Sequence, residues 1–238
     1  MTQTPTGDTP LGAMRFNSDS QKLEYFNGDV WMQVHTFNPD LNGGGRGLFS
    51  GGRSTDVIQY ITISTAGNSV DFGNTTESSR EGGAASSRTR GLTCGSYPAY
   101  SNVIDYVTFA TTGDAQDFGD LPDSRRSMNS CSSETRGVFV GGIDGPGAPT
   151  CNIIDFVTIA STGDAVDFGD ITVARADGAG VASPTRGLMI GGETPSSNFN
   201  TIDYVTIATT GNAADFGDAS VGASRGQAGS SDCHGGLS

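Results

Sequence analysis

One frame of fixed spacings repeats four times along the chain, and only one step in it changes length. In each repeat an Arg-Gly marker is followed six residues later by the second residue of a Gly-Gly (Gly-Ser in the second repeat). A polar residue then precedes the central aromatic. The Asp of an Asp-Phe-Gly lies 12 residues after this polar residue, and the next marker lies 19 residues after that Asp. The step from Gly-Gly to the polar residue takes 7, 9, 13 and 11 residues. The markers are Arg46, Arg90, Arg136, Arg186 and finally His234. The frame predicts a repeat protein in which one loop of each unit varies freely.

Each repeat is predicted to form four short strands and no helix. The chain has 36 Gly and only 16% charged residues, and no stretch keeps a helical period. The third strand is rich in Ile, Val, Thr and Tyr, which favour a pleated surface, and a Gly-Asx turn follows it. The second strand follows the marker and the fourth carries Asp-Phe-Gly. The first strands, made of small residues, are expected at 82–87, 128–133, 178–183 and 226–231, and the third strands at 58–63, 104–109, 154–159 and 202–207.

This order of features resembles the kelch repeat of β-propellers. The fourth repeat shows it with a small-residue strand from Gly178, then Arg186, Gly191-Gly192, Tyr204 and Phe216. The chain departs from the family by having Phe where Trp is usual. The resemblance covers about residues 44–234. It implies an all-β fold, a four-bladed kelch-like β-propeller over residues 46–238 behind a small N-terminal β module.

Two ways of completing the ring stay open at this stage. No small-residue strand precedes Arg46, and the strand expected at 226–231 has no complete blade after it. One interpretation is that this C-terminal strand joins the first blade and closes the ring, which removes two sheet edges. The other is that His234 starts a further blade and that several chains combine into a larger ring.

Residues 1–37 lie outside the repeat and are expected to form a separate module, joined by a linker at 38–45. Strands are predicted at 12–16, 22–26 and 30–34, with an Asn27-Gly28 hairpin turn. Three strands of this size bury little by themselves. We expect the module to be stabilised by a partner, by self-association or by the propeller.

The module resembles one found in virion proteins of tailed bacteriophages. The matching residues are Gly12, Arg15-Phe16-Asn17-Ser18, Leu23-Glu24-Tyr25-Phe26-Asn27-Gly28 and Trp31. The resemblance implies a structural virion protein of a fibre, collar or tail, made in the host cytoplasm and contacting other virion proteins. The residues expected to support assembly, including homo-oligomers, are Arg15, Phe16, Tyr25, Phe26 and Trp31.

The variable loops are the predicted recognition surface. They cover residues 53–57, 97–103, 143–153 and 193–201, and they should gather on one face because they share one place in the repeat. Aromatic rings beside amides are typical of binding surfaces. The candidates for binding a host glycan or protein are Tyr97, Tyr100, Asn152, Asn198, Phe199 and Asn200. The alternative functions are a particle-decorating protein without receptor binding and a cellular kelch-like interaction domain.

Composition argues against several other functions. The net charge of −13 disfavours nucleic acid, and no apolar run is long enough to cross a membrane. With two His residues and no catalytic motif, we expect no enzyme activity and no cofactor. Asp-Phe-Gly occurs four times, as a strand feature and not as a kinase motif.

Metal binding is not expected either. The four Cys form no C-x-x-C pair and are expected to be free thiols. The Asp114, Asp117 and Asp120 spacing could offer oxygens to calcium, which takes six to eight oxygen ligands, but hydrogen bonding at turns and strand ends is the favoured interpretation. The repeated Arg and Asp, such as Arg136 and Asp155, are expected to pair within or between blades.

Overall fold

The computed structural model describes residues 9–17, 22–34, 45–52, 55–78, 80–98, 100–220 and 228–231. Within these residues every regular element is a strand, 22 in all, so the all-β prediction is confirmed. The chain divides into two compact units, Met1–Asp40 and Leu41–Ser238. Most of the predicted linker, residues 38–44, lies outside the described residues.

The N-terminal unit is the predicted three-stranded antiparallel sheet. Its strands are β1 (Met14–Asn17), β2 (Lys22–Phe26) and β3 (Trp31–Gln33), in the order β1-β2-β3. Asn27 forms the expected turn, because its side-chain oxygen accepts hydrogen bonds from the backbone N–H groups of Asp29 and Val30. Gly28 supplies the positive φ of 103° that this turn needs.

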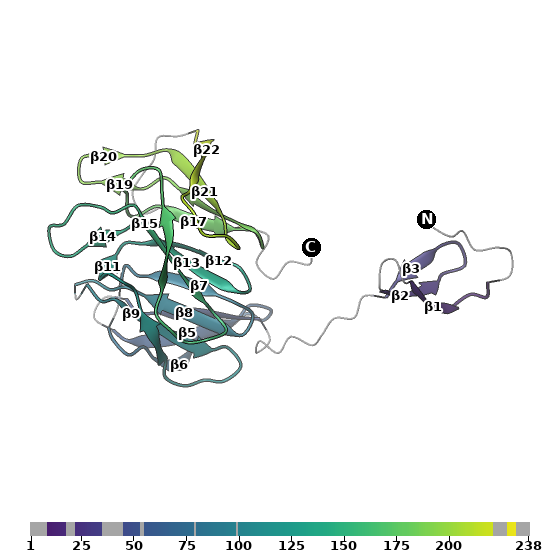
Figure 1. The fold of residues 1–238 in the computed structure, drawn as a ribbon. Coiled ribbons are helices and arrows are strands. Elements are labelled where there is room, and N and C mark those ends of the chain that lie inside the picture. The colour runs from purple at the N-terminus through teal and green to yellow at the C-terminus, as the bar shows by residue number, and fades with distance from the viewer. Residues whose placement is uncertain are drawn as a thin grey trace. The chain divides into compact units, whose positions relative to one another are not determined.

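The second unit contains four antiparallel sheets, one per sequence repeat, stacked in chain order from the β5–β6 end to the β21–β22 end (Figure 1). Three of them have four strands in chain order, and the first has three. The first sheet holds β4 (Arg46–Ser50), β5 (Val57–Thr62) and β6 (Val70–Asn74); the second β7 (Gly83–Ser86), β8 (Arg90–Cys94), β9 (Val103–Thr108) and β10 (Gln116–Asp120); the third β12 (Asn129–Ser132), β13 (Arg136–Val140), β15 (Ile153–Thr158) and β16 (Val166–Asp170); the fourth β17 (Ala179–Ala182), β18 (Arg186–Ile190), β21 (Thr201–Thr206) and β22 (Ala214–Asp218).

Two short two-stranded ribbons include residues of the third and fourth variable loops. They pair β11 (Arg125–Arg126) with β14 (Ile143–Asp144), and β19 (Glu193–Thr194) with β20 (Ser197–Asn198). Figure 1 shows β14, β19 and β20 on the same side of the unit. The third and fourth variable loops therefore lie on the same side of the unit in this view (Figure 1).

The Gly of Asp-Phe-Gly is required where one sheet meets the next. The register shifts beside it in each sheet, and at Gly119 and Gly169 φ is 145°. A Cβ at Gly119 would lie 2.5 Å from the carbonyl oxygen of Gly163 in the following sheet. Only glycine allows this approach.

A second repeated contact joins neighbouring sheets through the marker Arg. In every repeat its guanidinium lies over the central aromatic ring, which packs edge-on against the Phe of Asp-Phe-Gly. Arg46 also donates to the carbonyl oxygen of Phe109 (2.6 Å), and Arg90 to that of Ile159 (3.0 Å). Arg136 bonds Ile207 in the same way. The hydrophobic core accordingly lies between sheets, in clusters shared by adjacent repeats.

The two outer sheets each leave one face uncovered. Phe216 of the fourth sheet is 53% exposed, whereas the equivalent Phe118 is 3% exposed. At the other end Phe49 and Ile63 of the first sheet are exposed. The described residues thus form a stack of small sheets with two open ends.

The expected C-terminal strand does not form in the described residues. Residues 228–231 contain no strand, and the first sheet has no partner beyond β4. Instead Ser231 donates a hydrogen bond to the carbonyl oxygen of Ala182 (2.8 Å) in β17, and Gly229 lies close to Val181. This tail segment therefore continues the stacking of β7, β12 and β17, each of which contacts the next.

Candidate functional site

Two tyrosines predicted for ligand binding come together in the second variable loop. Tyr97 and Tyr100 pack edge-on, with ring centroids 6.0 Å apart. The guanidinium groups of Arg80 and Arg126 lie 4.4 Å and 4.9 Å from the centre of the Tyr97 ring. The ring faces are thus occupied by arginine, which leaves less aromatic surface for a sugar than the sequence suggested.

The polar groups around these rings give the cluster a different chemistry. Arg126 is held by Glu81 (2.8 Å) and donates from Nε to the Tyr100 hydroxyl (3.2 Å). Nε of Arg80 is buried and makes no hydrogen bond in the described part of the chain. Guanidinium groups bind carboxylate and phosphate in bidentate fashion. The cluster therefore combines two guanidinium groups with the Glu81 carboxylate and the two tyrosines.

The remaining loop candidates belong to the third and fourth repeats. Asn152 and Asn200 occupy one repeat position, and their backbone carbonyl oxygens accept from the backbone N–H groups of Ile171 and Ala219. Asn102 does the same for Leu121, so this position has a structural role in the repeat. Nearby, Phe199 is half-buried and donates its N–H to Gly192, while Asn198 in β20 is exposed.

The five assembly candidates divide between the two faces of the N-terminal sheet. One face is apolar and exposed, with Phe16 and Tyr25 among five such side chains: Met14, Phe16, Leu23, Tyr25 and Met32.

The other face carries the remaining three candidates. Arg15 lies 4.3 Å from the centre of the Trp31 ring, and Phe26 packs against Trp31 at 5.5 Å. Arg15 also pairs with the buried Glu24 (2.8 Å). Hydrogen bonds from Asn17 and then Arg15 lower the pKa of Glu24. The side chains of this face thus contact one another, whereas those of the apolar face are exposed.

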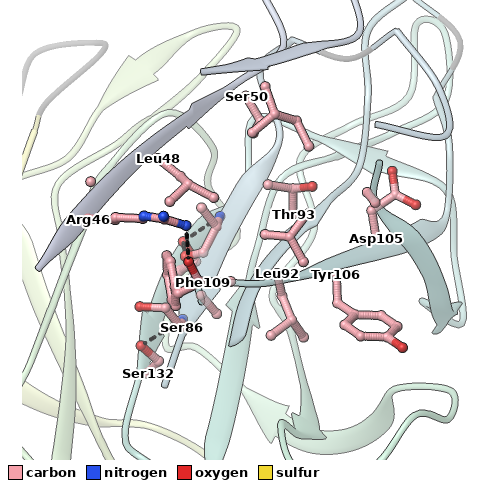
Figure 2. Close-up of a pocket in the computed structure, with 18 of the residues that line it drawn as sticks. Arg46, Leu48, Ser50, Ser86, Leu92, Thr93, Asp105, Tyr106, Phe109 and Ser132 are labelled. Carbon is pink, nitrogen blue, oxygen red and sulfur yellow. Dashed lines mark hydrogen bonds between the residues drawn. The ribbon is translucent and has the colours of Figure 1, made fainter. Parts of the chain in front are cut away.

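A cavity lies where the first sheet lacks a first strand (Figure 2). Its volume is about 450 Å³, and residues of β4, β5, β7, β8, β9, β12 and β17 line it. In the other three sheets the first strand pairs with the second along this edge. The cavity therefore has the position of the missing strand.

The lining of this cavity suits a backbone better than a reactive substrate. In Figure 2 Arg46 reaches the Phe109 carbonyl, and Ser86 and Ser132 meet through a bond from the Ser86 N–H to the Ser132 hydroxyl (3.3 Å). Burial raises the pKa of the Cys131 thiol to about 12, so this thiol stays protonated and weakly nucleophilic. In the described ranges no three His, Cys, Asp or Glu side chains gather to hold a metal ion.

The expected pairing of Arg136 with Asp155 is wrong. Asp155 pairs with Arg125, and Asp203 pairs with Arg175 (2.9 Å), all four side chains being buried. Arg136 is held instead by Phe156 and the Ile207 carbonyl. A signal for the true partners exists in the sequence, since Arg125 and Arg175 each lie eight residues after the Asp of an Asp-Phe-Gly.

No protein-family model and no curated protein matches this chain. Within the described ranges, no helix has the length and apolar character to cross a membrane.

Proposed function

We propose that the chain is a structural virion protein of a tailed bacteriophage, a component of a fibre or tail that contacts the host surface. The N-terminal unit attaches it to other virion proteins or to further copies, and the repeat unit displays the variable loops. The observation that carries this proposal is the uncovered apolar face of a sheet too small to be stable alone. The resemblance of residues 12–31 to a phage virion module agrees with it.

The assembly role predicts the effect of a charge on the apolar face. Phe16→Asp should abolish association of the full chain with itself or with its particle, because a carboxylate on this face cannot be desolvated in an interface. Arg88→Asp, at an exposed side chain of the repeat unit, serves as the control. Native mass measurement gives the stoichiometry. This role would be contradicted if the unchanged protein and Phe16→Asp were both monomeric and joined particles equally well.

The recognition role rests on the arginine and tyrosine cluster. Its donors favour a host-surface glycan that carries carboxylate or phosphate groups. Such a ligand would bind beside Arg80, whose guanidinium lies over the Tyr97 ring. The arginine donors of the cluster matter here more than the net charge of the chain, because salt screens the other charges of the surface beyond about 10 Å at moderate ionic strength.

Variants in the cluster test this role. Tyr97→Ala should reduce binding of the full chain to host cells at least tenfold, because it removes the ring that positions both guanidinium groups. Tyr97→Phe keeps the ring and should retain binding. Cell binding measured by flow cytometry separates the variants. If Tyr97→Ala binds like the unchanged protein, the cluster is not the receptor site, and a particle-decorating role becomes the better assignment.

We further propose that the repeat unit acts as a closed four-bladed kelch-like propeller, with residues 226–231 as the missing first strand. Three observations support this. The cavity beside β4 lies where a first strand of the first sheet would lie, and the tail already lies against β17. The two open ends also carry the two partners of the contact that a marker Arg makes with a carbonyl of the next sheet. Arg186 would donate to Ile63 as Arg46 does to Phe109. A cellular kelch-like interaction domain would share this ring, but it would not need the N-terminal sheet for assembly.

A further inference from the structure

A small cavity in the second sheet occupies the place that a buried guanidinium fills in the next two. Arg125 donates to the carbonyl oxygens of Gly141 (3.1 Å) and Ile153 (3.3 Å) and pairs with Asp155. Arg175 pairs with Asp203 and donates to the carbonyl oxygen of Met189 (3.3 Å) and to that of Val173, two residues before it (3.2 Å). Both guanidinium groups are fully buried.

The repeat frame identifies the equivalent place in the second sheet. The position of Arg125 and Arg175 is held there by Ser79, which lies outside the described residues. Each residue that accepts a hydrogen bond from Arg125 or Arg175 has an equivalent in the second sheet or in the segment before it, and all these equivalents line one cavity. They are Glu77, Thr93, Gly95, Ser101, Val103 and Asp105. The cavity volume is about 10 Å³, room for one water-sized group such as the NH₂ end of a guanidinium.

Asp105 is a buried carboxylate that has no cationic partner among the described residues. It is 6% exposed and accepts bonds from the N–H (2.9 Å) and hydroxyl (2.7 Å) of Thr76. Asp203 accepts the same two bonds from Thr172, and in addition it has Arg175. The second sheet therefore keeps the acceptors of the site and lacks its donor.

The other charges around Asp105 are also negative. Burial first, and then the charges of Glu77 and Asp117, raise its pKa, whereas the bonds from Thr76 lower it. A buried charge is costly unless it is paired, so a cation in this cavity would relieve the folded protein of that cost.

We propose that the cavity beside Asp105 binds the tip of a guanidinium group, either as a free small cation or as the arginine side chain of a partner. The ligand class follows from the aligned sites, because the same acceptor positions hold guanidinium in the two following repeats.

Thermal unfolding of the full chain in low-millimolar guanidinium chloride tests this proposal. Tm should rise relative to sodium chloride of equal ionic strength, because a ligand bound only by the native state stabilises it by mass action. Asp105→Asn should remove the rise, since the amide keeps the shape and loses the charge. Asp117→Asn, at a nearby exposed carboxylate, should keep it.

Ser79→Arg provides a second variant that does not depend on adding a ligand. By sequence register it supplies the missing guanidinium, so it should raise Tm by several degrees and abolish the response to guanidinium chloride. N-acetyl-arginine amide separates the two sources: a rise equal to that with guanidinium indicates a side-chain ligand, and no rise indicates a free cation. The proposal is overturned if guanidinium gives no specific rise, if Asp105→Asn retains it, or if Ser79→Arg still responds.

Discussion

Arg175→Met should lower the free energy of unfolding by about 3–5 kcal/mol, the usual cost of leaving one buried charge of an ion pair without its partner. Arg175 and Asp203 are both fully buried, and their closest nitrogen and oxygen atoms are 2.9 Å apart. The thioether fills part of the space but offers no donor to the Asp203 carboxylate or the Met189 carbonyl. Urea unfolding at neutral pH, followed by circular dichroism, measures the loss. Such a loss is a large part of the stability of an average domain.

An exposed ion pair of the same unit provides the control. Arg88 and Glu134 lie 3.3 Å apart, with more than half of each side chain in solvent. Arg88→Met should cost less than about 1 kcal/mol, because water screens exposed pairs. Adding Asp203→Asn to Arg175→Met should recover part of the stability, since the amide still accepts from Thr172 and carries no charge. Equal losses for Arg88→Met and Arg175→Met would show that burial of the pair contributes nothing.

The sequence predicted the strands of this protein better than their partners. Strand positions and order follow from the frame, because Gly-Gly, the Gly-Asx turn and Asp-Phe-Gly each mark a place where the backbone must turn or bulge. The ion pairs, in contrast, could not be predicted from this frame. Arg136 and Asp155 stand at positions that carry Arg in all four repeats and Asp in three of them, yet Arg136 lies over an aromatic ring and Asp155 pairs with Arg125. Regular spacing identifies equivalent positions, but it does not identify which of them meet across strands.

The candidate sites show the same limit. The backbone carbonyls of Asn152 and Asn200 accept a bond that recurs at their repeat position, a role that the sequence did not predict, while their side-chain amides stay candidates for ligand binding. Tyr97 and Tyr100 do lie together, yet Arg80 and Arg126, which change the chemistry of their cluster, come from other segments of the chain. The length of the repeat also does not determine whether the first and fourth sheets meet, because it does not determine the rotation from one sheet to the next.

Two phenylalanines at one repeat position test whether those ends meet. Phe139 and Phe49 each lie three residues after a marker, in β13 and β4. Phe139 is 0% exposed and packs against Gly83 of the preceding sheet, whereas Phe49 is 59% exposed because no sheet precedes its own. Phe139→Ala should cost about 3–5 kcal/mol in unfolding free energy, from lost burial and the cavity that remains.

The result for Phe49→Ala depends on closure of the ring. If residues 226–231 fill the cavity beside β4 and bring the fourth sheet against the first, Phe49 is buried as Phe139 is, and the two losses should be similar. If the stack stays open, Phe49→Ala is a surface change and should stay within about 0.5 kcal/mol. Urea unfolding of both variants distinguishes these outcomes, with Phe139→Ala showing that the assay detects a buried ring.

Protein concentration then decides which chain supplies the covering sheet. The matching halves of the contact, Arg186 at one end and the Ile63 carbonyl at the other, can meet within one chain or between two copies. Closure within one chain makes the Phe49→Ala loss independent of concentration, whereas a head-to-tail contact makes stability rise with concentration by mass action. Because a head-to-tail contact that does not close continues into a filament, a concentration-independent loss with a monomeric native mass is the result that the closed propeller requires.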